Sequence, residues 1–174
     1  MKTLVDQLSK YADYHRDPRN ILTHYVGVPM IMLAVVILLA RLGWGRVAGF
    51  PITLALLAAV AAAVYYWRLD RCYGTAMGLV LAAMLALAVP IAGQSTALWL
   101  ISGLGLFALG WVIQFVGHFY EGRKSAFMDD IMGLIIGPLF VAAELGFAMG
   151  FRKEVQAAVE QRSGPVRRRS LAGA

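Results

Sequence analysis

Charged residues are scarce in this sequence. Only 15% of its 174 residues are charged and 60% are hydrophobic, whereas a soluble domain carries about 25% charged residues. The apolar residues also form runs long enough to cross a bilayer, which takes about 20 residues of helix. The sequence therefore predicts an all-α integral membrane bundle rather than a soluble domain.

Cysteine is almost absent too. Cys72 is the one cysteine in the sequence, so an intramolecular disulfide and a cysteine-based metal knuckle are both excluded. The formal net charge is +6, and most basic residues fall in the expected loops and tails, where they suit anionic lipid head groups. A nucleic-acid partner would require a basic patch on a folded soluble surface, which this sequence does not predict. The expected partner is therefore membrane lipid.

Four apolar runs predict membrane-spanning helices joined by short loops. They cover about residues 21–40, 47–67, 72–91 and 97–117, and each is close to the length that crosses a bilayer. Glycine and alanine recur through these runs, which allows helices to pack closely in lipid. We therefore expect a single membrane domain over residues 1–151.

Residues 1–17 are amphipathic, with apolar residues such as Leu4 and Leu8 at helical spacing. This pattern predicts either an interfacial helix on the membrane surface or a helix packed on the bundle. The segment should end at Asp17 and Pro18, because Asp17 can cap a new helix and Pro18 suits its first position.

A fifth apolar segment, residues 131–151, either crosses the membrane or forms a re-entrant pair of half-helices bent at Gly137 and Pro138. The re-entrant arrangement is favoured, because a full span would carry the basic tail, residues 152–174, away from the side that holds most basic loops. The tail itself is predicted to be disordered, since it is rich in arginine and poor in apolar residues.

The three histidines of the sequence should meet at one face of the membrane. Four crossings return the chain to its starting side, so His118, at the end of the fourth run, reaches the face where His15 and His24 precede and begin the first run. The basic loop residues favour the cytoplasmic side for this face. The composition indicates a bacterial inner membrane, or the endoplasmic reticulum in a eukaryote.

These histidines predict a metal site. His118 and Glu121 are three residues apart and share one helical turn, while His24 and His15 come from another helix and the segment before it. Neutral imidazole is the commonest protein ligand for transition metals. Three imidazole nitrogens with an optional carboxylate suit Fe(II) or Zn(II), and an incompletely filled set of ligands would leave room for a substrate.

Five other polar residues are candidates for supporting roles. Gln114 and Asn20, each one turn before a histidine, could hold the ligand imidazoles in place. Arg123 and Lys124 could contact a substrate carboxylate or, equally, a lipid phosphate. Glu144 is a functional candidate because a carboxylate inside an apolar run is unfavourable, although a buried ion pair or hydrogen bond would also explain it.

Other interpretations of the histidines stay open. A single histidine at a membrane interface is often only an amphipathic side chain that reaches water. The same set could hold zinc in a membrane hydrolase of a lipid amide or ester, or could bind haem with His24 and His118 as axial ligands. A transport or structural bundle with histidines along a pathway is the remaining alternative. Metal content, a Soret band and oxygen uptake distinguish these functions.

Two motifs resemble those of a known family. The first contains Tyr14, His15, Asn20, His24, Gly27 and Pro29, and the second is the run Gln114-Phe-Val-Gly-His118-Phe-Tyr-Glu121-Gly-Arg-Lys. In order and spacing, over about residues 11–147, they resemble the family of membrane 2-hydroxy-fatty-acid dioxygenases. Its fungal members act in the alpha-oxidation step of phytosphingosine breakdown. One departure is Ser125-Ala126, where the family usually has Pro-Ala, which alters a turn rather than a ligand.

The resemblance implies an Fe(II)-dependent enzyme that works without 2-oxoglutarate. Such an enzyme uses O2 to shorten a 2-hydroxy fatty acid by one carbon, with release of the carboxyl carbon. Carried over by position, His15, His24 and His118 would be iron ligands or essential site residues, with Glu121 close by as a catalytic residue. The implied partners are therefore Fe(II), O2 and a 2-hydroxy fatty acid whose acyl chain lies among the helices.

Overall fold

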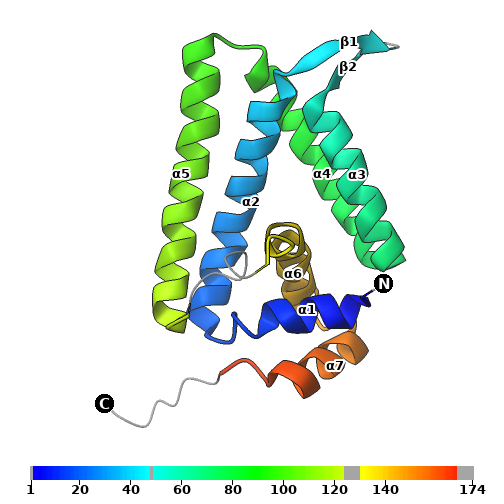
Figure 1. The fold of residues 1–174 in the computed structure, drawn as a ribbon, viewed down its shortest axis with the longest axis vertical. Helices are drawn as coiled ribbons and strands as arrows, with labels where there is room; N and C mark the ends of the chain where they lie inside the picture. Colours follow the sequence, from blue (N-terminus) through cyan, green and yellow to red (C-terminus); the bar gives the residue numbers. More distant parts are fainter. Residues whose placement is uncertain (1, 48, 124–129, 168–174) are drawn as a thin grey trace. The chain divides into compact units, whose positions relative to one another are not determined.

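The chain is mainly helical, with one short hairpin (Figure 1). The structure, a computed structural model, describes residues 2–47, 49–123 and 130–167. The helices are α1 (Leu4–Ala12), α2 (Pro18–Ala40), α3 (Leu54–Leu69), α4 (Arg71–Ala92), α5 (Thr96–Glu121), α6 (Gly133–Ala148) and α7 (Lys153–Ser163). The strands β1 (Gly43–Val47) and β2 (Phe50–Thr53) pair antiparallel, with Gly43 opposite Thr53 and Val47 opposite Phe50.

Among the described residues, three helices are long and apolar enough to cross a membrane, namely α2, α4 and α5. They correspond to the predicted spans 21–40, 72–91 and 97–117. Large apolar side chains on these helices are exposed, as at Leu79 (70%) and Ile101 (69%). Exposure of this kind suits contact with lipid, and the predicted all-α membrane bundle is confirmed.

The predicted second span, 47–67, begins too early in the sequence, so its predicted start is wrong. Val47 and Phe50–Thr53 are strand, and the apolar helix that follows, α3, has 16 residues. Gly49, at φ +83°, supplies the left-handed conformation that the tight hairpin turn requires. Thr53 then caps α3 by accepting the backbone N–H of Leu56 at 3.2 Å. A helix of this length measures about 24 Å, which is shorter than the roughly 30 Å hydrocarbon core of a bilayer.

The chain forms two compact units, Met1–Val26 with Ile113–Ala174, and Gly27–Val112. In the second unit, small residues allow close packing of α3 on α4, and a side chain at Gly74 would collide with the backbone of Trp67. The buried apolar cluster of this unit comes from α2, α3 and α4, and consists of Val36, Ile37, Ala40, Ala55, Ala88 and Ala92.

In the first unit, α1 packs against α6 and α7 (Figure 1). Its buried face includes Leu4, Leu8 and Tyr11. Thr3 and Asp6 form a reciprocal capping box at its start, and the helix ends at Ala12. Packing on the bundle, one of the two predicted arrangements, is therefore confirmed, while the position of α1 relative to the membrane surface stays a prediction.

The fifth apolar segment is a continuous helix, so the predicted bend at Gly137 and Pro138 is wrong. Helix α6 runs through Pro138, and the chain turns instead between α6 and α7, whose axes differ by 115°. Gly150 and Arg152 adopt positive φ angles of +83° and +51° in that turn. The bent pair is either a broken span or a re-entrant loop, so the choice between these two stays a prediction.

Part of the tail is also helical where disorder was predicted for residues 152–174. Helix α7 covers Lys153–Ser163, and its Val155 and Val159 are buried. These valines give the basic segment an apolar face, which α7 uses to pack on α1. Residues 164–167 have no regular secondary structure, and the end of the predicted disordered tail, residues 168–174, lies outside the described residues.

Candidate metal centre

Three buried histidines converge in the first unit. His15 lies in the linker between α1 and α2, His24 in the second turn of α2, and His118 in the last turn of α5. Their exposed fractions are 0%, 1% and 8%, and one ring nitrogen from each lies within 4.8 Å of the others. The structure thus brings together all three residues predicted as ligands, and their occupation by a metal stays a prediction.

Backbone carbonyls orient two of these rings. Nδ1 of His15 lies 2.7 Å from the carbonyl oxygen of Tyr11, and Nδ1 of His24 lies 2.8 Å from that of Asn20. A carbonyl oxygen only accepts, so both Nδ1 atoms carry a proton and the neutral rings present bare Nε2 atoms. These two Nε2 atoms lie 3.0 Å apart. Facing lone pairs repel each other unless a cation or a proton lies between them, so the pair is suited to a shared cation.

The chemistry of the donor set fits a transition metal. A metal–imidazole bond measures about 2.1 Å, so two ligands near a right angle would have nitrogens about 3.0 Å apart. Burial, and next the neighbouring His24, holds the pKa of His15 well below its ordinary value. This ring therefore stays neutral at pH 7, which is the form that coordinates a metal.

Buried polar atoms without a partner, at His118 and Asn20, support this fit. Nδ1 of His118, Oδ1 of Asn20 and Oε1 of Gln114 are buried and have no hydrogen-bond partner within the described ranges. Such atoms are unfavourable in a protein interior unless a ligand, water or ion satisfies them. Asn20 thus lies at the histidines, where a supporting role was predicted for it. Asn20 supports His24 through its backbone carbonyl, whereas Gln114 keeps a predicted role only.

Close approach of α2 and α5 allows His118 to meet His24. Gly117 immediately precedes His118, and a Cβ atom at this glycine would collide with the side chains of Thr23 and Asn20. The absence of a side chain at this position therefore sets how near the two helices can lie. Motif spacing alone does not reveal this contact, since it joins residues almost a hundred positions apart.

Two aromatic rings enclose His15. The ring of Tyr11 stacks parallel to the imidazole, with centroids 4.2 Å apart and an interplanar angle of 1°. Phe140 of α6 lies 5.5 Å from the His15 ring and 5.0 Å from the Tyr11 ring. Gly137 makes room for this arrangement, because a Cβ atom there would lie 2.8 Å from the Tyr11 hydroxyl oxygen. Sequence analysis missed Tyr11 and Phe140 as site residues, because each looks like an ordinary core aromatic.

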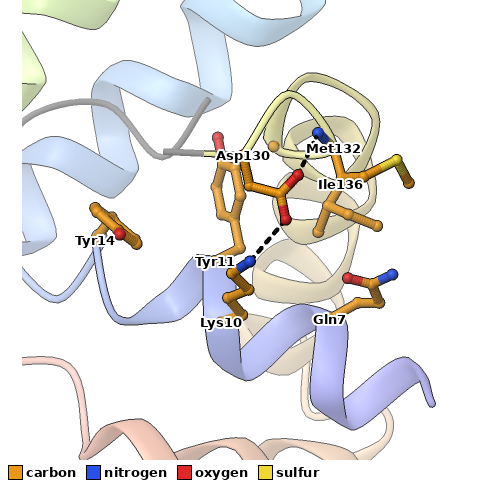
Figure 2. Close-up of a pocket in the computed structure, with 8 residues that line it drawn as sticks. Gln7, Lys10, Tyr11, Tyr14, Asp130, Met132 and Ile136 are labelled. Atoms are coloured by element: carbon orange, nitrogen blue, oxygen red, sulfur yellow. Dashed lines mark hydrogen bonds and ion pairs between the residues drawn. The ribbon is translucent and has the colours of Figure 1, made fainter. Parts of the chain in front are cut away.

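A small pocket between α1 and the start of α6 adjoins Tyr11 (Figure 2). Lys10 and Asp130 form an ion pair of 2.6 Å at this pocket, and Tyr11, Tyr14 and Ile136 line it. Its volume is about 20 Å³, which is room for about one water molecule. The pocket is therefore too small to receive an acyl chain in this conformation.

Glu121 holds the linker that carries His15. Its Oε2 accepts the backbone N–H groups of Arg16 at 3.0 Å and Asp17 at 2.7 Å, and the side-chain amide of Asn20 at 3.1 Å. Asn20 in turn orients His24, and Glu121 lies one turn after His118. The carboxylate thus connects the three ligand-bearing segments. Its predicted role as a catalytic residue stays untested, and its geometry is that of a positioning residue.

The predicted start of α2 is confirmed at Asp17. This carboxylate accepts the backbone N–H of Arg19 at 2.8 Å and pairs with the Arg19 side chain, also at 2.8 Å. The hydrogen bonds from Arg19 hold the pKa of the Asp17 carboxyl below its ordinary value. The cap fixes where the helix begins, and hence the turn on which His24 lies.

Glu144 forms a buried ion pair, which was predicted as the alternative to a functional role. Arg16 Nη2 lies 3.4 Å from Glu144 Oε1, with side chains 7% and 11% exposed. The Arg16 Nε also donates to the carbonyl oxygens of Ala12 and His15, at 2.9 and 3.0 Å. Burial lowers the pKa of Arg16, and Glu144 opposes this shift. Sequence analysis missed Arg16. The signal for it was the carboxylate of Glu144 inside an apolar run, because such a group needs a buried cation, and Arg16 lies next to a candidate ligand.

Of the two basic residues predicted to contact an anion, the structure describes Arg123 only. Arg123 is exposed, and its Nη1 donates to the carbonyl oxygen of Asp13 at 2.7 Å. Lys124 lies outside the described residues. Contact of either residue with a substrate carboxylate stays a prediction.

Comparison with known proteins identifies relatives over most of the chain. The sequence model of the family described as 2-hydroxy-palmitic acid dioxygenase Mpo1-like matches residues 1–149. Among curated proteins, the chain is similar to the 2-hydroxy-palmitic acid dioxygenase MPO1 of Saccharomyces cerevisiae. The two are 31% identical over 159 residues, which cover 90% of this chain and 87% of the yeast protein. No solved structure matches the chain significantly. The family match includes every histidine and ends before α7.

Proposed function

Because the chain belongs to the Mpo1-like family of 2-hydroxy-palmitic acid dioxygenases, we propose that it is a membrane dioxygenase of 2-hydroxy fatty acids. The family match and the yeast relative support the substrate class and the use of O2. The observation that carries the proposal within this chain is the set of three buried histidines whose ring nitrogens lie within 4.8 Å of one another.

The proposed reaction shortens the acid by one carbon: R–CH(OH)–COOH + O2 gives R–COOH + CO2 + H2O. The bond between the carboxyl carbon and the hydroxyl-bearing carbon breaks. The carboxyl carbon leaves as CO2, and the hydroxyl-bearing carbon becomes the new carboxyl group. O2 accepts all the electrons that the substrate loses, so the reaction needs no 2-oxoglutarate as co-reductant.

His15, His24 and His118 would hold Fe(II), which supplies the electron chemistry that lets O2 react with an organic acid. The carbonyl groups of Tyr11 and Asn20 keep Nδ1 of His15 and His24 protonated, and so reserve both Nε2 atoms for coordination. Glu121 keeps the linker and α2 in register with α5. The protein thus prepares the ligand set before a metal arrives.

The surroundings of the histidines would control water and orient the substrate. Tyr11 and Phe140 cover the His15 ring with apolar surface, which excludes bulk water from that side of the site. The acyl chain would lie in apolar surroundings among the helices, with its carboxylate and hydroxyl directed toward the histidines. We further propose that this face of the membrane is cytoplasmic, since the predicted topology puts most basic loop residues on the same side as the histidines.

The decisive test is the metal content and activity of the full-length protein, purified in detergent without oxygen. We expect near-stoichiometric iron without a Soret band, and O2 uptake with 2-hydroxypalmitate but not with palmitate. His24→Ala and His118→Ala should each lose iron and turnover, while Arg46→Gln, an exposed change in β1, should keep both.

Three results would contradict the proposal. Stoichiometric zinc with no O2 uptake would favour a membrane hydrolase, and a Soret band would favour a haem protein. Full turnover in both histidine variants would remove the metal site itself from consideration.

A further inference from the structure

An open hollow of about 770 Å³ lies beside the linker that carries His15. Its walls come from α1, the linker between α1 and α2, Arg123 just after α5, and the end of α7 with the residues that follow. Five cationic side chains and one carboxylate line it, together with Tyr14, Ser163 and Pro165; the charged residues are Lys10, Arg16, Arg123, Arg162, Arg167 and Asp13. We call this feature the basic hollow.

Some of its positive charge is already paired. Lys10 forms the ion pair with Asp130, and Arg16 is turned to Glu144 in the interior. The three other cations, Arg123, Arg162 and Arg167, are exposed. Of these, Arg162 also pairs with Asp6, and Arg167 lies 3.6 Å from Glu121. Attraction for a ligand must therefore come from Arg123 and from the N–H donors that the other two guanidinium groups leave unused.

These guanidinium groups retain most of their donors. Arg123 uses Nη1 for the carbonyl of Asp13 at 2.7 Å, and Arg162 uses Nη1 for Asp6 at 2.5 Å. Arg167 has Nη2 at 3.6 Å from Glu121. Each guanidinium has five N–H donors in a planar fork that matches phosphate oxygens. The contacts found among the described residues use one nitrogen of each group.

The basic hollow adjoins the ends of two long apolar helices, α2 and α5. Arg16 precedes the first residue of α2 by two positions, and Arg123 follows the last residue of α5 by two positions. Both helices are long and apolar enough to cross a membrane. The ends of spanning helices lie where hydrocarbon gives way to head groups, and basic residues at that depth attract anionic lipids.

We propose that the basic hollow binds the phosphate of an anionic phospholipid head group. A phosphate diester offers two charged oxygens and two weaker ester oxygens, spread around a tetrahedral centre, to three guanidinium forks, whereas a carboxylate offers two oxygens in one plane. The carboxylate of a fatty-acid substrate must instead reach the three histidines, none of which lines the hollow. The proposal is independent of the proposed dioxygenase activity, and it assigns a lipid site next to the linker that holds His15.

The test is native mass spectrometry of the full-length protein in detergent, titrated with phosphatidylglycerol and, separately, with phosphatidylcholine. The wild type should retain phosphatidylglycerol selectively. The double variant Arg123→Gln with Arg162→Gln should bind it about 25-fold more weakly, because each basic residue at a membrane surface contributes about fivefold. The double variant Arg46→Gln with Arg68→Gln, which loses the same charge at exposed sites elsewhere, should bind like the wild type.

Competition identifies the source of the anion. Neither inorganic phosphate nor palmitate at millimolar concentration should displace the retained phosphatidylglycerol. Displacement by palmitate would overturn the proposal and indicate that the hollow binds fatty acids. Displacement by inorganic phosphate would also overturn it and indicate a site for free anions. Equal retention of the two phospholipids, or equal loss in both double variants, would also overturn it. If the double variant does not fold, Arg162→Gln alone should weaken binding about fivefold.

Discussion

The Nε2 atoms of His15 and His24 lie 3.0 Å apart in the interior of the protein, and the Nδ1 of each ring faces a backbone carbonyl. Both rings thus present a lone pair to the same small volume. A third imidazole, His118, has its ring centroid 5.0 and 5.2 Å from theirs. Such an arrangement favours the protein with a cation bound over the protein without one, and it links metal binding to stability.

Removal of the metal should therefore lower the thermal stability of the wild type. A ligand present at about 100 times its Kd stabilises the folded state by about 2.7 kcal/mol, which corresponds to about 5–10 °C in Tm for a chain of this size. Differential scanning fluorimetry before and after chelation, and after anaerobic return of Fe(II), measures this shift. The His24→Ala variant should show no shift on either treatment, and an equal shift in that variant would count against the histidine site.

Glu121→Gln should weaken metal binding without removing a ligand. Loss of the charge weakens the hydrogen bonds from the linker and Asn20 to about half their strength. Changes to groups that orient ligands typically lower metal affinity about 10- to 100-fold, and competition with a chelating dye measures this. Glu154→Gln, at an exposed ion pair with Arg152, is the matched control and should have little effect. Unchanged affinity with lost turnover would instead assign Glu121 to catalysis.

Gly137→Ala should disturb the stack of Tyr11 on His15. The new Cβ would lie 2.8 Å from the Tyr11 hydroxyl oxygen, and overpacking of this kind costs about 1–3 kcal/mol. Adding Tyr11→Phe removes the hydroxyl and should recover part of the loss in Tm and in bound metal. Gly78→Ala, where nothing lies within 4 Å of the added Cβ, should leave both unchanged or slightly improved. If the losses in Tm of the two single variants simply add in the double variant, the Tyr11 hydroxyl is not the group with which the new Cβ collides.

Acid should loosen the contact between α1 and α7. The backbone N–H of Thr3, and next the Arg162 side chain, lower the pKa of Asp6 from 3.8 to about 2. A lowered pKa means that the carboxylate contributes stability above about pH 3.8 and loses it as the pH falls toward 2. The protection of α7 amides against hydrogen exchange, relative to the intrinsic rate at each pH, should therefore fall over that range. Asp6→Asn should remove this part of the pH dependence, and an unchanged profile would contradict the assignment.

Much of the framework can be predicted from local patterns. The apolar runs that become α2, α4 and α5 are long enough to require helices in lipid, because no water is present there to satisfy the backbone. Asp17 and Pro18 mark the start of α2 through a cap and a missing N–H, both of which are properties of neighbouring residues. The return of His118 to the face of His24 follows from the parity of the crossings.

Other features escaped prediction because a competing interaction prevailed. Thr53 caps α3 and leaves the preceding apolar residues to a hairpin, so the second run is shorter than its hydropathy indicates. Pro138 is accommodated within α6, and the chain bends instead at Gly150 and Arg152, where positive φ angles are adopted. Apolar composition does not distinguish these choices.

From the residues alone follow a helical membrane protein, three histidines near one face, and their likeness to a dioxygenase family. Those conclusions rest on periodicity, span length and motif order, which are all local or additive along the chain. Only the tertiary structure assigns Glu121 to the linker, Arg16 to Glu144, and Tyr11 to the His15 ring. The first two contacts join residues more than 100 positions apart. Tyr11 and His15 are four residues apart, but Phe140 of α6 completes the enclosure of the His15 ring. No pattern within one segment encodes such contacts between distant parts of the chain.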